Sequence, residues 1–185
     1  MHADSGRDQD PARTPRLVVI GNGMVGQRLL DSLFAEGTSA WKVTVLCEEP
    51  RPAYDRVPLS AFFSGKSAAD LALVQPEFFA KHGVDLRLGE QAASINRDAR
   101  VVRTTSGSEV PYDRLVMATG SAPFVPPIPG NDRQGCFVYR TIEDLEAIRD
   151  AGSKGGTGVV IGGGLLGLEA AKALKDLGLD THVVE

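Results

Sequence analysis

Two glycine-rich turns constrain this chain more than any other feature, because each follows a short apolar segment and opens a helix pattern. The turns are GNGMVG at residues 21–26 and GGGLLG at residues 162–167. In a GxGxxG turn the first glycine makes the bend, the second leaves room for a pyrophosphate, and the third lets the helix pack against the strand. Free N–H groups at the helix N-terminus face the anion. The two turns predict two dinucleotide-binding βαβ units.

An acidic residue follows the next apolar segment in each unit, where a ribose needs a hydrogen-bond acceptor. Glu48 and Glu185 each lie about 20 residues after the third glycine of their turn, which is the expected spacing. Glu49 is the alternative to Glu48, because strand ends are poorly fixed by pattern. Glu185 favours NADH, since a carboxylate repels a 2′-phosphate. The predicted cofactor-binding residues of the two turns are Gly21, Gly23, Met24, Gly26, Glu48, Glu49, Gly162, Gly164, Leu165, Gly167 and Glu185.

The remaining pattern predicts an α/β fold with a Rossmann-like first domain and an incomplete second Rossmann-like unit. Short segments within residues 92–112 predict a small antiparallel meander, and residues 114–118 return to the main sheet. A proline-rich connector follows, and Thr141 caps a helix that ends near Ala151. The apolar residues of the 165–177 helix are expected in the core. The expected domains are a disordered tail at 1–15, the first domain at 16–125, the connector at 126–140 and the incomplete second domain at 141–185.

Composition excludes several classes of protein. The 185 residues carry a net charge of −4 and 42% hydrophobic residues, which suits a globular domain and part of another. No basic run is present, so a nucleic-acid partner is not expected. No segment has the length of a membrane span or the pattern of a signal peptide. Cys47 and Cys136 form no CxxC, and the three His residues lack ligand spacing, which favours a reducing cytoplasmic setting without a bound metal.

Several segments resemble FAD-dependent pyridine nucleotide oxidoreductases of the ferredoxin-reductase-like branch: the two turns, YDRVPLS at 54–60 and ATGSAP at 118–123. A closer resemblance is to the N-terminal part of the large subunit of NAD(P)H-dependent nitrite reductases. It is carried by IGNGMVG at 20–26, CEEPRPAYDR at 47–56, FVYRTIED at 137–144 and GGGLLGLEA at 162–170. This resemblance covers roughly residues 15 to 185.

The resemblance implies an FAD in the first unit, NAD(P)H in the second, and hydride transfer from nicotinamide to flavin. It places Arg56, Leu59 and Ser60 between pyrophosphate and flavin, and Thr119 and Gly120 in a second FAD-contacting turn. It implies no catalytic side chain. In this family, which serves nitrate assimilation, electrons pass through iron–sulfur centres to a sirohaem that reduces nitrite to ammonium. Those centres are expected only in the missing downstream part. The implied partners besides NAD(P)H are downstream redox domains or a second subunit.

Two departures leave alternatives open. Many relatives of the ferredoxin-reductase branch have a lysine directly after the Leu-Ser pair, where this chain has Ala61. The family's later Gly-Asp segment and cysteine ligands are also absent, which leads us to expect an N-terminal fragment. A ferredoxin- or rubredoxin-reductase-like NAD(P)H:acceptor oxidoreductase and a non-catalytic FAD-binding fragment are the alternatives.

Overall fold

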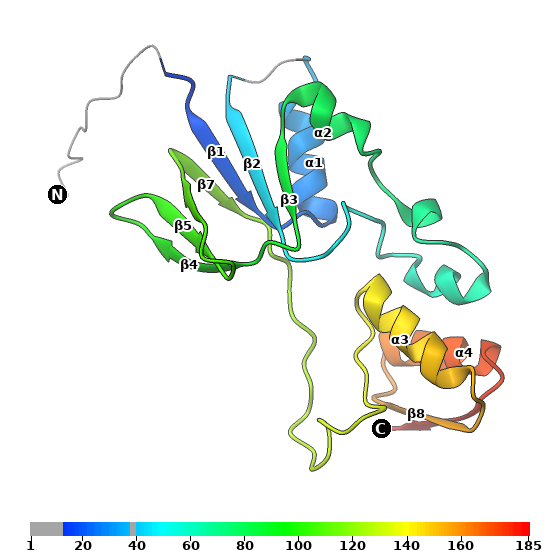
Figure 1. Cartoon of the computed structure of the whole chain (residues 1–185). Coiled ribbons are helices and arrows are strands. Elements are labelled where there is room, and N and C mark those ends of the chain that lie inside the picture. Colours follow the sequence, from blue (N-terminus) through cyan, green and yellow to red (C-terminus); the bar gives the residue numbers. More distant parts are fainter. Residues whose placement is uncertain (1–12, 38–39) are drawn as a thin grey trace. The chain divides into compact units, whose positions relative to one another are not determined.

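The computed structural model describes residues 13–37 and 40–185 (Figure 1). Most of the expected 1–15 tail lies outside the described residues. The chain forms two compact units. The first comprises the described residues up to Ala53 together with Val74–Gly120, and the second comprises Tyr54–Leu73 and Ser121–Glu185. The sequence-based domain bounds stay a prediction, and they differ from these units in assigning residues 54–73 to the first domain.

The first unit is built on a four-stranded parallel sheet in the order β3-β2-β1-β7. Its two helices are α1, Met24–Leu33, and α2, Glu77–His82. The strand β1 is apolar along its buried length because its alternate residues are buried on opposite faces of the sheet. Leu17 and Val19 pack with the helices, whereas Val18 and Ile20 pack with the meander on the other face. The strands are β1 Arg16–Ile20, β2 Lys42–Cys47, β3 Asp85–Leu88 and β7 Arg114–Met117.

The meander is antiparallel and has the order β4-β5-β6, which confirms the sequence prediction. Its strands are β4 Ala92–Asn96, β5 Val101–Thr104 and β6 Glu109–Pro111. Val102 and Val110 are buried against the sheet. In Figure 1 the helices α1 and α2 lie on one side of the sheet and strands β4 and β5 on the other. The predicted Rossmann-like fold is thereby confirmed for this unit.

The second unit contains a further βαβ and a separate apolar cluster. Parallel strands β8, Thr157–Ile161, and β9, Asp180–Val184, flank helix α4, Leu165–Asp176. The remaining elements are α3, Ile142–Gly152, and the short 3-10 helices η1, Leu59–Ser64, and η2, Ala69–Leu71. The cluster buries Tyr54, Leu59, Phe62, Leu71, Ile142 and Leu145.

A capping box begins α3, at the Thr141 cap that the sequence predicted. The Thr141 side chain accepts from the Asp144 N–H, and the Asp144 carboxylate accepts from the Thr141 N–H at 2.8 Å. Such reciprocal caps satisfy N–H groups that have no partner within the helix.

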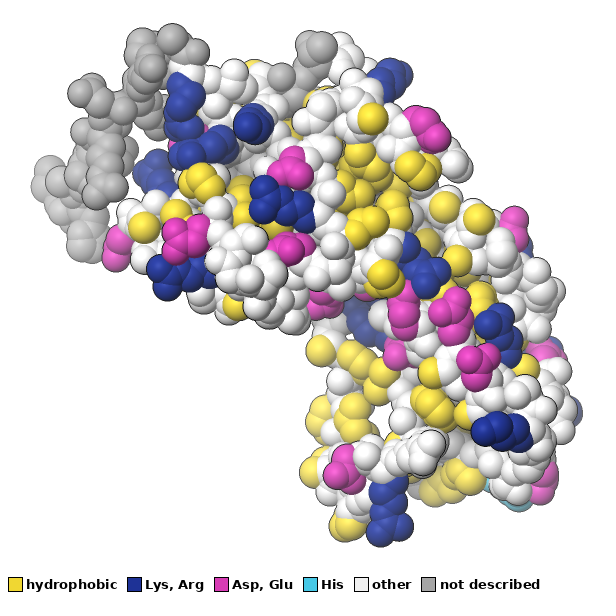
Figure 2. All heavy atoms as spheres, in the orientation of Figure 1, with side chains coloured by type: hydrophobic (Ala, Val, Ile, Leu, Met, Phe, Trp, Pro, Cys, Tyr) yellow, Lys and Arg dark blue, Asp and Glu magenta, His cyan; other side chains and the backbone are white. Residues whose placement is uncertain are grey.

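The expectation that the apolar residues of the 165–177 helix lie in the core is wrong for three of them, and four others are only partly buried. Leu165 is 90% exposed, Leu166 and Leu168 are more than half exposed, and Ala173 is the buried residue of α4. The reason is that the two-stranded β8-β9 sheet covers only a narrow face of α4. Hydrophobic side chains, in yellow, reach the surface between acidic and basic ones in Figure 2.

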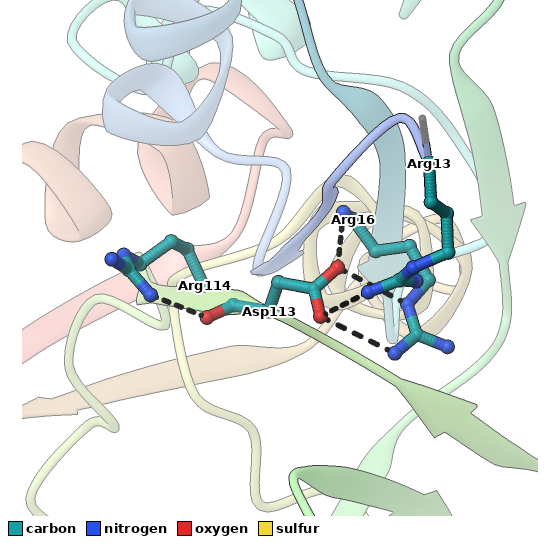
Figure 3. A network of polar contacts seen from close by, with 4 residues as sticks. All are labelled: Arg13, Arg16, Asp113 and Arg114. Carbon is teal, nitrogen blue, oxygen red and sulfur yellow. Dashed lines mark hydrogen bonds and ion pairs between the residues drawn. The ribbon is translucent and has the colours of Figure 1, made fainter. Parts of the chain in front are cut away.

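A charged network joins the start of β1 to the start of β7 (Figure 3). The Asp113 carboxylate accepts from the Arg16 backbone N–H at 2.6 Å, from the Arg16 guanidinium, and from the Arg13 guanidinium at 2.7 Å. The Arg114 guanidinium donates to the Asp113 carbonyl oxygen. Burial raises the pKa of the Asp113 carboxyl, but the Arg16 and Arg13 donors outweigh burial and hold this pKa well below its ordinary range.

We expect Asp113→Asn to lower the free energy of unfolding by about 1–3 kcal/mol, because it removes charge-assisted hydrogen bonds from a mostly buried group. The folded-state pKa lies below the unfolded value of about 3.9, so the contribution is complete above that pH and is lost as the pH falls toward the folded pKa. Urea unfolding at pH 7 and pH 3 measures both effects. The exposed Asp98→Asn is the control, and equal stability of the two variants at pH 7 would contradict the prediction.

Candidate functional site: two glycine turns and a polar cavity

The first glycine turn lies at the carboxyl edge of three parallel strands. The Gly21 N–H donates to the Leu46 carbonyl oxygen at the end of β2, at 2.8 Å. Gly21 has a φ of +104°, and a Cβ atom there would collide with the Ala118 carbonyl oxygen, just after β7. Only glycine tolerates both this left-handed backbone and this approach. The turn is therefore fixed between the ends of β2 and β7, where ligands bind in open parallel sheets.

The other two glycines of this turn differ in their surroundings as a dinucleotide site requires. A Cβ atom at Gly23 would meet no protein atom within 4 Å, so the space beside it is open. A Cβ atom at Gly26 would collide with the Gly21 carbonyl oxygen, because α1 packs closely on the turn. Met24 begins α1 and is 39% exposed. Gly23 thus leaves the approach to the helix N-terminus free, and Gly26 keeps the turn compact.

The structure brings the remaining predicted residues of the first unit to the same sheet edge. Glu48 and Glu49 directly follow β2, and the Glu48 carboxylate accepts from the Gln91 amide at 3.1 Å. Thr119 and Gly120 lie just after β7, beyond Ala118, and the Thr119 nitrogen lies 3.1 Å from the position a Gly21 Cβ would take. Both acids remain candidates for the ribose contact, since both stand at the end of β2.

The second glycine turn repeats this geometry. Gly162 has a φ of +107°, and its N–H donates to the Val184 carbonyl oxygen at 2.8 Å. A Cβ atom at Gly164 would meet nothing within 4 Å, whereas one at Gly167 would collide with the Gly162 carbonyl oxygen. The Glu185 carboxylate accepts a hydrogen bond from the Gly163 N–H. The predicted acid of this unit therefore lies directly against its turn. Leu165 begins α4 and is exposed.

Arg56, Leu59 and Ser60 lie in the second unit, where they surround or adjoin a cavity of about 160 Å³. The Arg56 guanidinium donates to the Arg140 carbonyl oxygen at 3.4 Å and stacks 5.0 Å from the centre of the Tyr54 ring. These contacts fix the guanidinium at the cavity wall. The cavity is lined by Arg56, Leu59, Tyr139, Arg140, Leu166 and Glu169.

Four of these lining residues were missed by the sequence analysis: Tyr139, Arg140, Leu166 and Glu169. Glu169 accepts from the Ser60 N–H at 3.3 Å and so connects α4 to η1. The buried Tyr139 hydroxyl has no hydrogen-bond partner among the described residues, and burial together with the Glu169 carboxylate raises its pKa. The motifs YRT and GLEA contain three of the four, but only the fold shows that they meet residues 56–60.

Two further properties concern the described part of the chain. Within residues 13–37 and 40–185, no helix has both the length and the hydropathy needed to cross a membrane. In the same residues, no three His, Cys, Asp or Glu side chains are grouped so that they could hold a metal ion.

Comparisons with a family model and with individual relatives agree on one kind of protein. The model of the family described as pyridine nucleotide-disulphide oxidoreductase matches residues 15–185. The chain is 54% identical over 171 residues to the nitrite reductase (NADH) large subunit of Escherichia coli, with 92% of this chain and 20% of that protein covered. It is 55% identical over 172 residues to the nitrite reductase [NAD(P)H] large subunit of Klebsiella oxytoca, with 92% and 18% covered. The chain thus spans about one fifth of the length of these relatives.

Among solved structures, the reductase in the covalent putidaredoxin reductase–putidaredoxin complex superposes with a TM-score of 0.78 and 32% identity. The match covers 91% of this chain and 42% of that one.

Proposed function

Because the chain belongs to the pyridine nucleotide-disulphide oxidoreductase family, we propose that its first glycine turn binds FAD and its second binds NAD(P)H. The observation that supports this most is the repeated pair of environments in the two turns. In each turn, a Cβ atom on the second glycine would meet no protein atom, whereas one on the third would collide with the carbonyl oxygen of the first. Two such cradles in one chain suit two pyrophosphates.

The residues around each turn fit their dinucleotide chemically. In the first unit, Glu48 or Glu49 would accept from the adenosine ribose, and Thr119 and Gly120 would line the approach to the flavin. In the second, Glu185 would accept from the ribose of NADH and repel a 2′-phosphate. Arg56, with Leu59 and Ser60, would serve the region between pyrophosphate and flavin, since a guanidinium is a strong phosphate donor. A bound FAD would supply two-electron redox chemistry, with NAD(P)H as the source of the electrons.

We further propose that these residues form the electron-input part of an NAD(P)H-dependent nitrite reductase large subunit. The identity of 54–55% to two such subunits supports this assignment over a putidaredoxin-reductase-like enzyme, to which the identity is 32%. The downstream part would carry the iron–sulfur centres and the sirohaem, downstream redox domains or a second subunit would be the partners, and the cytoplasm would be the compartment.

The test is the flavin content of the purified chain. We expect FAD at close to one per chain after incubation with FAD and gel filtration, and bleaching of its absorbance by NADH more readily than by NADPH. A folded protein that retains no flavin would overturn the FAD assignment. Bound FAD that NADH does not reduce would favour a non-catalytic FAD-binding fragment, and a preference for NADPH would refute the role given to Glu185.

A further inference from the structure

Asn22, the residue between the first two glycines of the first turn, makes a buried contact outside the motif. It is 6% exposed, and its side-chain oxygen accepts from the Ala53 N–H at 3.0 Å. The two residues are 31 positions apart, so the bond is a tertiary one. It ties the turn to the far end of residues 48–53, which we call the acidic segment because it begins with Glu48 and Glu49.

Other contacts hold the near end of the acidic segment. The Glu90 N–H donates to the Cys47 carbonyl oxygen and the Gly89 N–H to the Glu49 carbonyl oxygen, at 2.9 and 3.1 Å. Burial raises the pKa of the Cys47 thiol, so the thiol stays protonated and its S–H points to the Arg51 carbonyl oxygen at 3.7 Å. At the far end, the Asn22 side chain bonds the N–H of Ala53, which is 1% exposed. Removing the Asn22 amide would therefore loosen the segment at one end only.

The second turn contacts its acidic residue in a different way. Its corresponding residue is Gly163, whose N–H bonds directly to the Glu185 carboxylate. A Cβ atom at Gly163 would stand 2.8 Å from a Glu185 oxygen, so a side chain there would displace the acid. In the first turn a side chain is present, and it accepts from the N–H of Ala53, four positions after Glu49. The second turn thus bonds directly to its acid, whereas the first bonds through a carboxamide to the far end of the segment that carries its acids.

Only one of the two polar atoms of the Asn22 carboxamide is paired. Its Nδ2 atom is buried and has no partner among the described residues. An unpaired buried donor lowers the stability of a fold, and natural sequences keep such groups mainly where they serve a site. The oxygen of the same carboxamide makes the bond to Ala53, so the benefit of Asn22 lies in that bond.

We infer that Asn22 is a positioning residue of the first dinucleotide site: by holding Ala53 at the glycine turn it fixes the far end of the acidic segment, whose acids are held at the near end by the other contacts. The inference rests on the proposed FAD site, because these acids would serve the adenosine ribose while the turn receives the pyrophosphate. Holding both in place before binding reduces the entropy lost when the dinucleotide binds. Asn22 acts through Ala53 and the segment, without being the residue that accepts from the ribose.

The test uses the whole chain with Asn22→Ala, and Asn96→Ala as a matched control. Asn96 lies in the same unit and its side-chain oxygen also accepts a backbone N–H, that of Ala99, at 2.9 Å. We expect Asn22→Ala to weaken FAD binding by roughly tenfold, the factor that corresponds to one hydrogen bond. Hydrogen exchange at the Ala53 amide should become faster, while NADH affinity, which depends on the other turn, stays unchanged. The control should match the wild type in all three measurements.

The outcomes separate the inference from the proposed function. Wild-type protein that binds FAD, with Asn22→Ala binding it equally well, overturns the positioning role and leaves the FAD site standing. Folded wild-type protein that binds no FAD overturns the FAD site and the inference with it. Equal weakening of FAD and NADH binding indicates general damage and also overturns the positioning role.

A second variant keeps the test decisive if Asn22→Ala does not fold. Asn22→Asp retains an oxygen that can accept from Ala53, so exchange at the Ala53 amide should stay slow. Exchange at the Ala53 amide is the readout for this variant, because salt screens the repulsion between a buried carboxylate and a pyrophosphate only weakly. Fast exchange at the Ala53 amide in this variant would show that the Asn22 side-chain oxygen does not hold Ala53, and would overturn the positioning role.

Discussion

Replacing Gly26 by alanine is expected to disrupt the first glycine turn and to abolish FAD retention. The added Cβ atom collides with the Gly21 carbonyl oxygen, so α1 must move away from β1. Such overpacking costs about 1–3 kcal/mol or more. Because Gly21 itself packs directly against the Ala118 carbonyl group, the turn cannot shift away from α1 without a further collision. Urea unfolding and the FAD-to-protein ratio measure the two effects.

Gly23→Ala is the matched experiment, since it adds the same single carbon two positions from the start of the turn. Gly23 has φ −90° and ψ −165°, an extended backbone that alanine adopts readily, and its Cβ would meet no protein atom. We expect unfolding within about 1 kcal/mol of the wild type, the range for an N-cap glycine replaced by alanine. FAD affinity should nevertheless fall at least tenfold, because the carbon occupies the space left for the pyrophosphate.

The pair distinguishes packing from binding. If Gly23→Ala retained FAD as well as the wild type, the pyrophosphate would not approach this glycine, and the assignment of the first turn would be wrong. If Gly26→Ala unfolded like the wild type, the close contact between α1 and the turn would be relieved by a movement that leaves the fold intact.

Replacing Gly164 by valine is expected to stop reduction of the flavin by NADH while leaving FAD bound. Gly164 has φ −67° and ψ 178°, which valine tolerates, and its Cβ would point into open space. The branched side chain would fill the position where the NADH pyrophosphate approaches the N-terminus of α4. We expect the rate of flavin bleaching by NADH at fixed concentration to fall by about 100-fold or more, the equivalent of roughly 3 kcal/mol.

Dithionite provides the control for this variant, because it reduces bound flavin without using the nucleotide site. Gly164→Val should bleach with dithionite at the wild-type rate and should hold as much FAD as the wild type. Normal bleaching by NADH would show that the nucleotide does not use this turn. Loss of FAD from the variant would show instead that the substitution damages more than the second site.

The local features of both sites could be predicted from the sequence. The turns, the helices after them and the acids at the strand ends depend on short-range rules, and the structure places Gly21, Gly26 and Gly167 in the tight positions that the motif requires. The antiparallel meander followed from apolar segments separated by turn residues. The family resemblance is confirmed, since the family model covers residues 15–185. The roles of the individual site residues stay predictions.

What escaped the sequence depends on contacts between distant segments. Ser60 and Glu169 are 109 positions apart, and no periodicity in the sequence indicates that the Ser60 backbone N–H meets the Glu169 side chain. The exposure of Leu165 and Leu168 was missed because helical spacing shows which residues share a face and not how wide the surface opposite that face is. The buried bond from Asn22 to Ala53 was missed for the first reason, since the motif treats its second residue as variable.

The membership of residues 54–73 in the second unit has a consequence for how the chain matures. Tyr54, Leu59, Phe62 and Leu71 leave the ribosome early, but the cluster they form also needs Ile142 and Leu145 of α3. The Ile142 N–H even donates to the Tyr54 hydroxyl. During translation, the first unit has all its strands once Gly120 has emerged, whereas the segment inserted within it must keep its aromatic side chains unburied until α3 has been made. The second unit is thus the later of the two to complete its core, although part of it is synthesised before β3, β4 and β7.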